Sequence, residues 1–188
     1  MTRKLSEMTL EELWQLFPII LTAHDAKWSE WYNDEYEKLC VIFSGMKTRI
    51  SHIGSTAIKT IWAKPVIDIL IEIPLENDIG KVKTLIIQNG YICMAENKQN
   101  ISFNKGYTEK GFAEKVFHLH LRYWGNNDEL YFRDYMNDNP MVAKEYEKLK
   151  LSLWKLYEHN RDGYTNAKHD FIYKYTKTAK EKYKDRYL

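Results

Sequence analysis

Two short stretches of this sequence combine an extended pattern with polar residues that could do chemistry. In KPVIDILIEI, residues 64–73, isoleucines alternate with other residues, and Asp68 lies in the middle of the second face. In VFHLHLRYW, residues 116–124, His118 and His120 share one face of a second predicted strand. A carboxylate in such a strand is costly to bury alone, so it needs a metal ion, a cation or hydrogen-bond donors as a partner.

A turn of small residues precedes the acidic strand. HIGST, residues 52–56, predicts a turn in which Gly54, Ser55 and Thr56 expose backbone N–H groups and hydroxyls, as phosphate-binding turns do. Tripeptides of this kind are also common in turns that bind nothing. Lys64, at the start of the acidic strand, is either a phosphate-binding cation or a solvated lysine. Together these residues predict a phosphate site next to the acid.

The spacing of the histidines suggests a metal site. If the two strands are neighbours, His118 and His120 join Asp68 in a set of one acid and two imidazoles, with His52 as a fourth candidate ligand. Imidazoles suit Mn²⁺, Zn²⁺, Fe or Ni better than Mg²⁺. Hydrogen bonds alone could also satisfy both histidines, which would leave a polar pocket without a metal. Both interpretations stay open at this point.

Other charged residues have two interpretations each. Arg133, in FRDYM, either forms an ion pair with Asp134 that fixes a helix to the sheet or meets an anionic ligand in the pocket. Lys168 and His169 are secondary candidates for the site, and Tyr164 is expected to be a packing residue.

The strands expected to carry these residues lie in the middle of the chain, and helices flank them. Capping signals and apolar spacings of three and four residues predict helices at 9–18, 25–43, 78–89, 129–137, 140–157 and 165–183. Extended patterns predict strands at 19–22, 49–53, 66–73, 91–94, 101–103 and 116–124. This order indicates a single α/β (α+β) domain over residues 1–188, with a small mixed β-sheet flanked by helices and a helical C-terminal third.

Composition indicates an ordinary globular domain. The 188 residues are 44% apolar and 29% charged, and the formal net charge of +2 argues against a nucleic-acid partner, which needs a concentrated basic surface. No apolar run approaches the roughly 20 residues of a membrane span, so no membrane partner is expected. The two cysteines lack CxxC spacing, as in reduced cytosolic proteins. We expect a cytoplasmic protein with a small-molecule or nucleotide ligand, and we predict no oligomeric state.

The stretch HIGSTAIKTIWAKPVIDILIEI, residues 52–73, resembles the signature of the GrpB-like family in the nucleotidyltransferase superfamily. The resemblance continues through HLHL at 118–121, FRDYM at 132–136, Tyr146, LK at 149–150 and YTNAKHDFI at 164–172. It implies a nucleotidyltransferase-like fold, with a divalent metal (Mg²⁺ or Mn²⁺) as cofactor and an NTP as substrate. This chain departs from the family's usual GSTSVPGL, because Lys59 and Thr60 replace its Pro-Gly. A glycine-dependent backbone conformation is therefore in doubt there.

Two functions follow from the resemblance. Nucleotidyltransferases hold two Mg²⁺ ions with carboxylates at i and i+2 of one strand face; here Asp68 takes the first place and Leu70 the second. Glu72 lies about 13 Å further along the strand. In the first hypothesis, the small-residue turn holds the triphosphate and Asp68 the metal. His118 or His120 then supplies a second metal contact or a proton-transfer group for nucleotidyl transfer to a small acceptor. The alternative, which Leu70 favours, is a non-catalytic regulatory module that binds a nucleotide, another anion or a metal.

Overall fold

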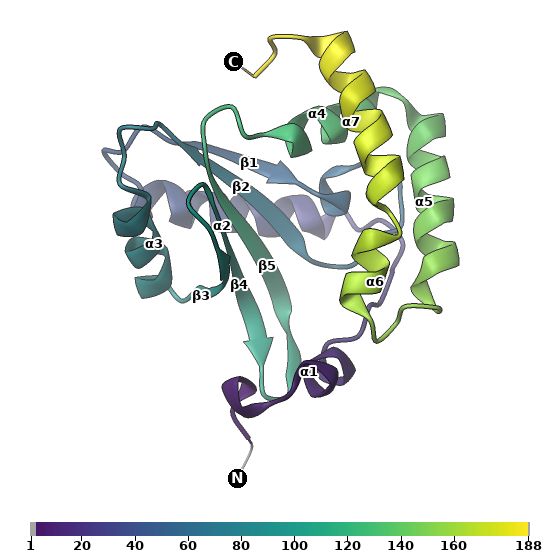
Figure 1. Ribbon diagram of the computed structural model, residues 1–188, viewed down its shortest axis with the longest axis horizontal. Coiled ribbons are helices and arrows are strands. Elements are labelled where there is room, and N and C mark those ends of the chain that lie inside the picture. The colour runs from purple at the N-terminus through teal and green to yellow at the C-terminus, as the bar shows by residue number, and fades with distance from the viewer. Residues whose placement is uncertain (1–2, 188) are drawn as a thin grey trace.

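Five strands form one mixed sheet in the computed structural model, which describes residues 3–187 (Figure 1). Their order across the sheet is β1-β2-β5-β4-β3. The bounds are Arg49–Ile53 for β1, Ile67–Ile73 for β2, Ile92–Glu96 for β3, Asn100–Thr108 for β4 and Gly111–Tyr123 for β5. β2 and β5 run parallel, and the other neighbouring strands are antiparallel. The predicted mixed α/β architecture, a small mixed sheet with flanking helices, is confirmed.

The helices divide between the two faces of this sheet. They are α1 (Leu10–Leu16), α2 (Lys27–Ile42), α3 (Ile79–Gln88), α4 (Asp128–Asp138), α5 (Pro140–Trp154), α6 (Arg161–Asn166) and α7 (His169–Tyr183), with 3₁₀ turns η1 (Leu5–Glu7) and η2 (Ser55–Ala57). In Figure 1, α2 lies behind the sheet, whereas α5, α6 and α7 gather at its other side. No helix within residues 3–187 is long and apolar enough to cross a membrane.

One face of the sheet is the hydrophobic core that the isoleucine alternation predicts. All four isoleucines of β2 are fully buried there. They pack with Trp28 and Leu39 of α2 and with Val82 and Ile86 of α3. The burial of these large apolar side chains stabilises the fold and fixes the register of β2, since a shift of one residue would turn the isoleucines to the other face.

The opposite face carries the polar residues. The parallel pairing sets Asp68 beside His118 and Leu70 beside His120, so these four side chains leave the sheet on the same side. The predicted adjacency of the two strands is therefore observed. In the antiparallel β1–β2 pair, His52 lies beside Ile69, so the side chain of His52 leaves from the core face instead.

Several elements differ from the sequence-based expectation. The strand predicted at 19–22 is reduced to an isolated bridge between Thr22 and Ala63. Its backbone bonds elsewhere, because Ile19 N–H donates to the Glu158 carbonyl and Trp154 Nε1 donates to the Ile19 carbonyl. The long helix predicted at 165–183 is two helices, α6 and α7. β4 is longer than the predicted 101–103 because it forms a hairpin with β5, and α5 ends at 154 rather than 157.

The turn at Lys59 and Thr60, where the family pattern has Pro-Gly, has a backbone conformation typical of glycine. Thr60 has φ of 68°, in the left-handed region that side chains with a branched Cβ rarely adopt. Surrounding contacts hold this turn, because Lys144 Nζ donates to the Thr60 carbonyl at 2.6 Å and Asn137 accepts from Lys59 N–H at 3.0 Å. This chain therefore adopts a positive φ at residue 60 without a glycine.

Candidate active site

Asp68 is the centre of the polar face. Its Oδ1 lies 3.2 Å from His118 Nδ1 and 3.5 Å from His120 Nε2. The Asp68 side chain remains 26% exposed, so the carboxylate is accessible from one side. Since β2 and β5 place these residues side by side in register, the cluster is built by the sheet itself rather than by mobile loops.

The protonation states of this cluster are set by burial. Burial lowers the pKa of His118 to about 4, so its imidazole is neutral at pH 7. Burial alone would raise the pKa of Asp68, but the hydrogen bonds from His118 and His120 outweigh it and hold that pKa below its ordinary value. A neutral His118 donates one N–H to the ionised Asp68 and keeps a lone pair on Nε2.

Tyr107 extends this hydrogen-bonded chain. Its hydroxyl lies 2.7 Å from His118 Nε2 and donates to the lone pair there. The Arg161 guanidinium lies 3.4 Å from the same nitrogen. The result is a linear chain from the Tyr107 hydroxyl through the His118 ring to the Asp68 carboxylate.

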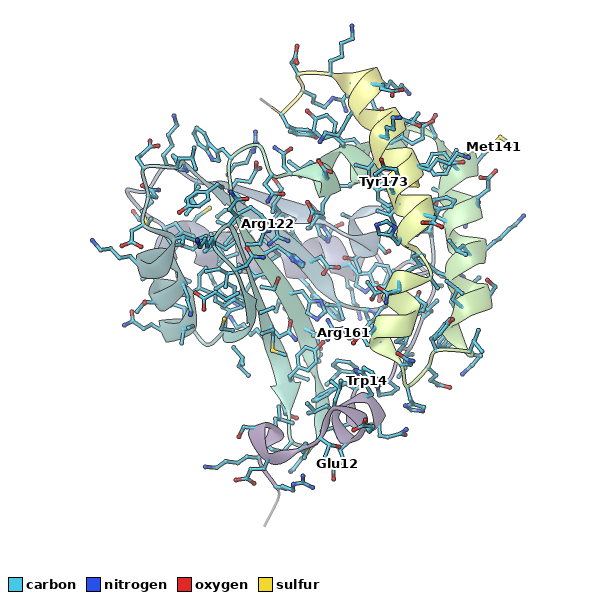
Figure 2. The ribbon with its side chains drawn as sticks, in the orientation of Figure 1. Glu12, Trp14, Arg122, Met141, Arg161 and Tyr173 are labelled. Carbon is cyan, nitrogen blue, oxygen red and sulfur yellow. The ribbon has the colours of Figure 1, made fainter. Side chains whose placement is uncertain are left out.

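A cavity of about 300 Å³ opens over this cluster. Four cationic side chains line it together with Asp68 and the two histidines: Lys64, Lys150, Arg161 and Lys168. Apolar residues form the rest of the wall, among them Ile19, Leu21 and Val66. Figure 2 shows Arg161 at the beginning of α6, between that helix and the strands. The cavity thus lies between the polar face of the sheet and the C-terminal helices.

These four cations are not balanced by protein carboxylates. Within residues 3–187 none of them forms an ion pair with an acid, and the one carboxylate of the cavity contacts the histidines. Burial lowers the pKa of Lys64 and Lys150 to about 7 and that of Lys168 to about 8. Because uncompensated buried charge is unfavourable, an anionic ligand would stabilise these cations in their protonated form.

Two residues of the cavity lining carry a buried polar atom that has no hydrogen-bond partner within residues 3–187. The Tyr164 hydroxyl is buried and, within the described chain, has no hydrogen-bond partner; the residue is only 7% exposed. His120 Nδ1 is also buried and has no hydrogen-bond partner in the part of the chain that the structure describes. Buried polar groups are nearly always hydrogen-bonded in folded proteins, so these two atoms would be satisfied by a water molecule or by a polar group of a ligand that reaches them.

The small-residue turn contributes in three different ways. Gly54 has φ of 71°, and a Cβ there would lie 2.9 Å from Asp68 Cγ, so only glycine lets the carboxylate approach. Ser55 lines the cavity, as predicted. Thr56 is 2% exposed, and its hydroxyl contacts the Val66 carbonyl at 3.1 Å. The Thr56 side chain therefore fixes the turn and does not face the cavity.

Two further predicted site residues are not brought into the cavity. His52 stacks on Tyr32 at 4.6 Å between ring centroids, on the core side of the sheet. Arg133 donates to the His52 carbonyl at 2.7 Å and pairs with Asp134 at 2.8 Å. Of the two interpretations of Arg133, the internal ion pair is the one observed; the pair lies within α4, and the hydrogen bond to the His52 carbonyl joins α4 to β1. Burial lowers the pKa of His52 to about 4.

The acidic residues do not reproduce a two-metal site. Leu70, at the second-carboxylate place, is fully buried against Ile53 and Leu130. Glu72 is also fully buried and is held by Arg49 through bonds of 2.5 and 2.7 Å. Within residues 3–187, no three His, Cys, Asp or Glu side chains are grouped so as to hold a metal ion by themselves. The donor set fits at most one ion that shares Asp68 with a ligand.

The sequence interpretation missed several residues of the cavity. Lys150 and Arg161 were not candidates, Lys168 was a secondary one, and Tyr164 was expected only to pack. Lys168 and Tyr164 both lie in YTNAKHDFI, so the resemblance to the family did point to them. Lys150 also lies within the resemblance, in LK at 149–150, but the pattern of its helix is that of packing, where a single lysine gives no sign that it turns inward.

Comparison with known proteins identifies the family. The GrpB protein family matches residues 18–178 of this chain. This chain belongs to the GrpB family. A GrpB relative, the UPF0157 protein YqkA of Bacillus subtilis, is 32% identical over 186 residues, which cover 96% of this chain and 52% of YqkA. The chain thus spans about half the length of that relative.

Two further GrpB proteins match over most of their own length. The glutamate-rich protein GrpB of Alkalihalophilus pseudofirmus is 35% identical over 160 residues, covering 82% of this chain and 91% of that protein. The crystal structure of GrpB from Enterococcus faecalis superposes with a TM-score of 0.75 and 30% identity, over 87% of this chain and 99% of that one. The Cid1 poly(U) polymerase superposes with a TM-score of 0.49 and 10% identity, a likeness too remote to speak of activity.

Proposed function

We propose that this GrpB protein binds the phosphates of a nucleoside triphosphate in the cationic cavity and transfers its nucleotidyl group to a small acceptor. The observation that supports this most is the group of four cations without acidic partners around Asp68, His118 and His120. A triphosphate is the common biological ligand whose charge matches such a group. The cavity volume of about 300 Å³ is at the lower end of small-molecule sites, so part of the nucleotide would extend out of the opening.

The cations would divide the phosphates between them. Arg161 can bind phosphate oxygens bidentately, whereas Lys64 and Lys168 act as point charges. The Ser55 hydroxyl lines the cavity near the start of η2 and can donate to a phosphate oxygen. These residues form a site that neutralises charge on the leaving pyrophosphate.

We propose that a divalent metal binds together with the nucleotide. Mg²⁺ and Mn²⁺ are often held by one or two carboxylates together with substrate phosphates rather than by a protein cage. Asp68 would hold such an ion, with His118 and His120 as further ligands if the ion is a transition metal. When bound, the ion would neutralise charge on the triphosphate.

His118 is the proposed proton acceptor for the incoming hydroxyl. Asp68 orients the ring through Nδ1, as in other base–orienter pairs, and the lone pair on Nε2 accepts the hydrogen bond of the Tyr107 hydroxyl. The pKa of about 4 makes the free imidazole a weak base. Bound phosphate would raise that pKa, because the positive charges of Arg161 and Lys64 contribute to its lowering.

One observation favours a second candidate function. Leu70 is fully buried where a second catalytic carboxylate would lie, and a non-catalytic module that binds a nucleotide as a regulatory ligand needs no such carboxylate. The two functions share the binding site and differ in whether pyrophosphate is released.

We expect NTPs to stabilise the protein in the presence of Mg²⁺ or Mn²⁺. At an NTP concentration about 100 times the dissociation constant, the melting temperature should rise by roughly 5–10 °C. The double variant Arg161→Met, Lys168→Met should lose the rise. Lys174→Met, Lys177→Met is the matched control, because it removes the same charge from exposed positions on α7. If no nucleotide shifts the wild-type melting temperature with any metal, the proposal is wrong.

Pyrophosphate release separates the two functions. Release that needs an acceptor and is lost in Asp68→Asn, but kept in the exposed control Asp170→Asn, supports an enzyme. Nucleotide binding without release across a panel of hydroxyl and amine acceptors supports the regulatory module.

A further inference from the structure

A bulge in β4 places Tyr107 on the polar face of the sheet. Asn104 pairs with His118, so the two side chains share a face. Strict alternation from Asn104 would send Tyr107 to the opposite, core face. The register shifts between Lys105 and Tyr107, and Gly106 there has φ of 90°. This extra residue turns Tyr107 toward His118, which is the way bulges re-aim side chains beside active sites.

The contacts of Tyr107 are those of an activated nucleophile. Its hydroxyl lies 2.7 Å from His118 Nε2, and His118 Nδ1 lies 3.2 Å from Asp68. A nucleophile within hydrogen-bond reach of a base, which a third group orients, is the arrangement of covalent catalysis. The phenol ring is held by Phe17 and Phe112, with ring centroids 4.6 and 5.2 Å away. The hydroxyl is therefore fixed in position before any ligand binds.

Positive charge lies next to this hydroxyl. The Arg161 guanidinium approaches the same His118 nitrogen at 3.4 Å. Burial raises the pKa of the Tyr107 phenol, and Arg161 partly offsets this rise. Tyr107 itself is not among the residues that line the cavity. A phosphate bound by Arg161 would approach the Tyr107 oxygen on the side of His118 Nε2, and its negative charge would also make His118 more basic.

We propose that Tyr107 is a covalent nucleophile that takes the nucleotidyl group of the NTP before the acceptor does. The inference rests on the proposed function. The Tyr107 oxygen attacks the α-phosphorus, an O–P bond forms, the bond to the β-phosphate oxygen breaks, and pyrophosphate leaves. The phenolic proton passes to His118 Nε2. In the second step the Tyr107 oxygen leaves with the proton that His118 held, and the acceptor hydroxyl attacks the same phosphorus. His118, neutral again, takes the proton of the acceptor hydroxyl and releases it to water.

The test is to incubate the protein with NTPs and Mg²⁺ or Mn²⁺ without an acceptor. Intact-mass and peptide mass spectrometry should find one added nucleoside monophosphate on Tyr107. Because the step is reversible, labelled pyrophosphate should also exchange into the NTP. Tyr107→Phe should lose both signals. Tyr173→Phe, which removes a phenol that is 64% exposed on α7, should keep both.

NTP binding measured on the same protein separates this inference from the proposed function. Wild-type protein that binds NTP but shows neither adduct nor exchange overturns the covalent role of Tyr107 and leaves the binding site standing. An adduct that persists in Tyr107→Phe overturns it as well. Failure to bind any NTP overturns the proposed function itself.

Discussion

NTP affinity should fall on the order of 100-fold between pH 6 and pH 9. A lysine is charged below its pKa and neutral above it. The pKa of Lys64 and Lys150 is about 7 and that of Lys168 about 8, so all three carry charge at pH 6 and lose nearly all of it by pH 9. Arg161 alone then remains to neutralise the phosphates. Isothermal titration at several pH values measures the effect.

Two internal controls accompany the pH series. The terminal phosphate of the NTP gains charge over the same range, which would strengthen binding, so it cannot explain a loss. In the folded protein the pKa values of these three lysines lie below the ordinary value of a lysine in an unfolded chain. Between about pH 7 and pH 10 the unfolded chain therefore binds more protons than the folded protein does. These lysines therefore contribute stability that rises with pH, and unfolding cannot explain the loss either. An affinity that is constant from pH 6 to pH 9 would contradict the role of the lysines.

Gly54→Ala should destabilise the protein by about 3 kcal/mol and abolish NTP binding. The backbone there has φ of 71° and ψ of −172°, a region that side chains hardly enter. The new methyl group would also lie 2.9 Å from Asp68 Cγ, which forces the carboxylate away from His118 and His120. Urea unfolding gives the change in the free energy of unfolding.

Gly45→Ala is the matched control for this variant. Gly45 also has positive φ, 82°, but a Cβ there would meet nothing within 4 Å. It should therefore show only the backbone strain, about 1 kcal/mol, and should leave NTP binding intact. Equal destabilisation by the two substitutions would mean that the contact between Gly54 and Asp68 contributes nothing.

The sheet half of the site could be predicted because strand alternation encodes it. The isoleucines of β2 fixed which face Asp68 would occupy, and the same period put His118 and His120 on one face of β5. Their adjacency then needed only one condition, that β2 and β5 pair. No comparable pattern in the sequence predicts the helical half of the site. Lys150, Arg161 and Lys168 reach the cavity because the C-terminal helices fold back over the sheet, and that packing has no local signature.

Exceptions to alternation caused the other differences. The bulge at Gly106 turns the Tyr107 side chain to the opposite face of the sheet. Strict alternation along β4 would have placed this phenol in the core. His52 lies one residue before Ile53, the partner of Asp68, and that single step sends it to the opposite face. Thr56 was assigned to a ligand because of its hydroxyl, yet it bonds to the backbone of Val66. Residue type alone did not distinguish these roles.

A crystal structure of the protein with a non-hydrolysable NTP analogue and Mn²⁺ would test the central claim most directly. We expect phosphate oxygens within about 3 Å of the Arg161 guanidinium and of Lys168 Nζ. They should lie beside Asp68 and near the hydrogen bonds that link Asp68 to His118 and His118 to Tyr107. A nucleotide bound on another surface, with the four cations of the cavity left without phosphate, would contradict the proposed site.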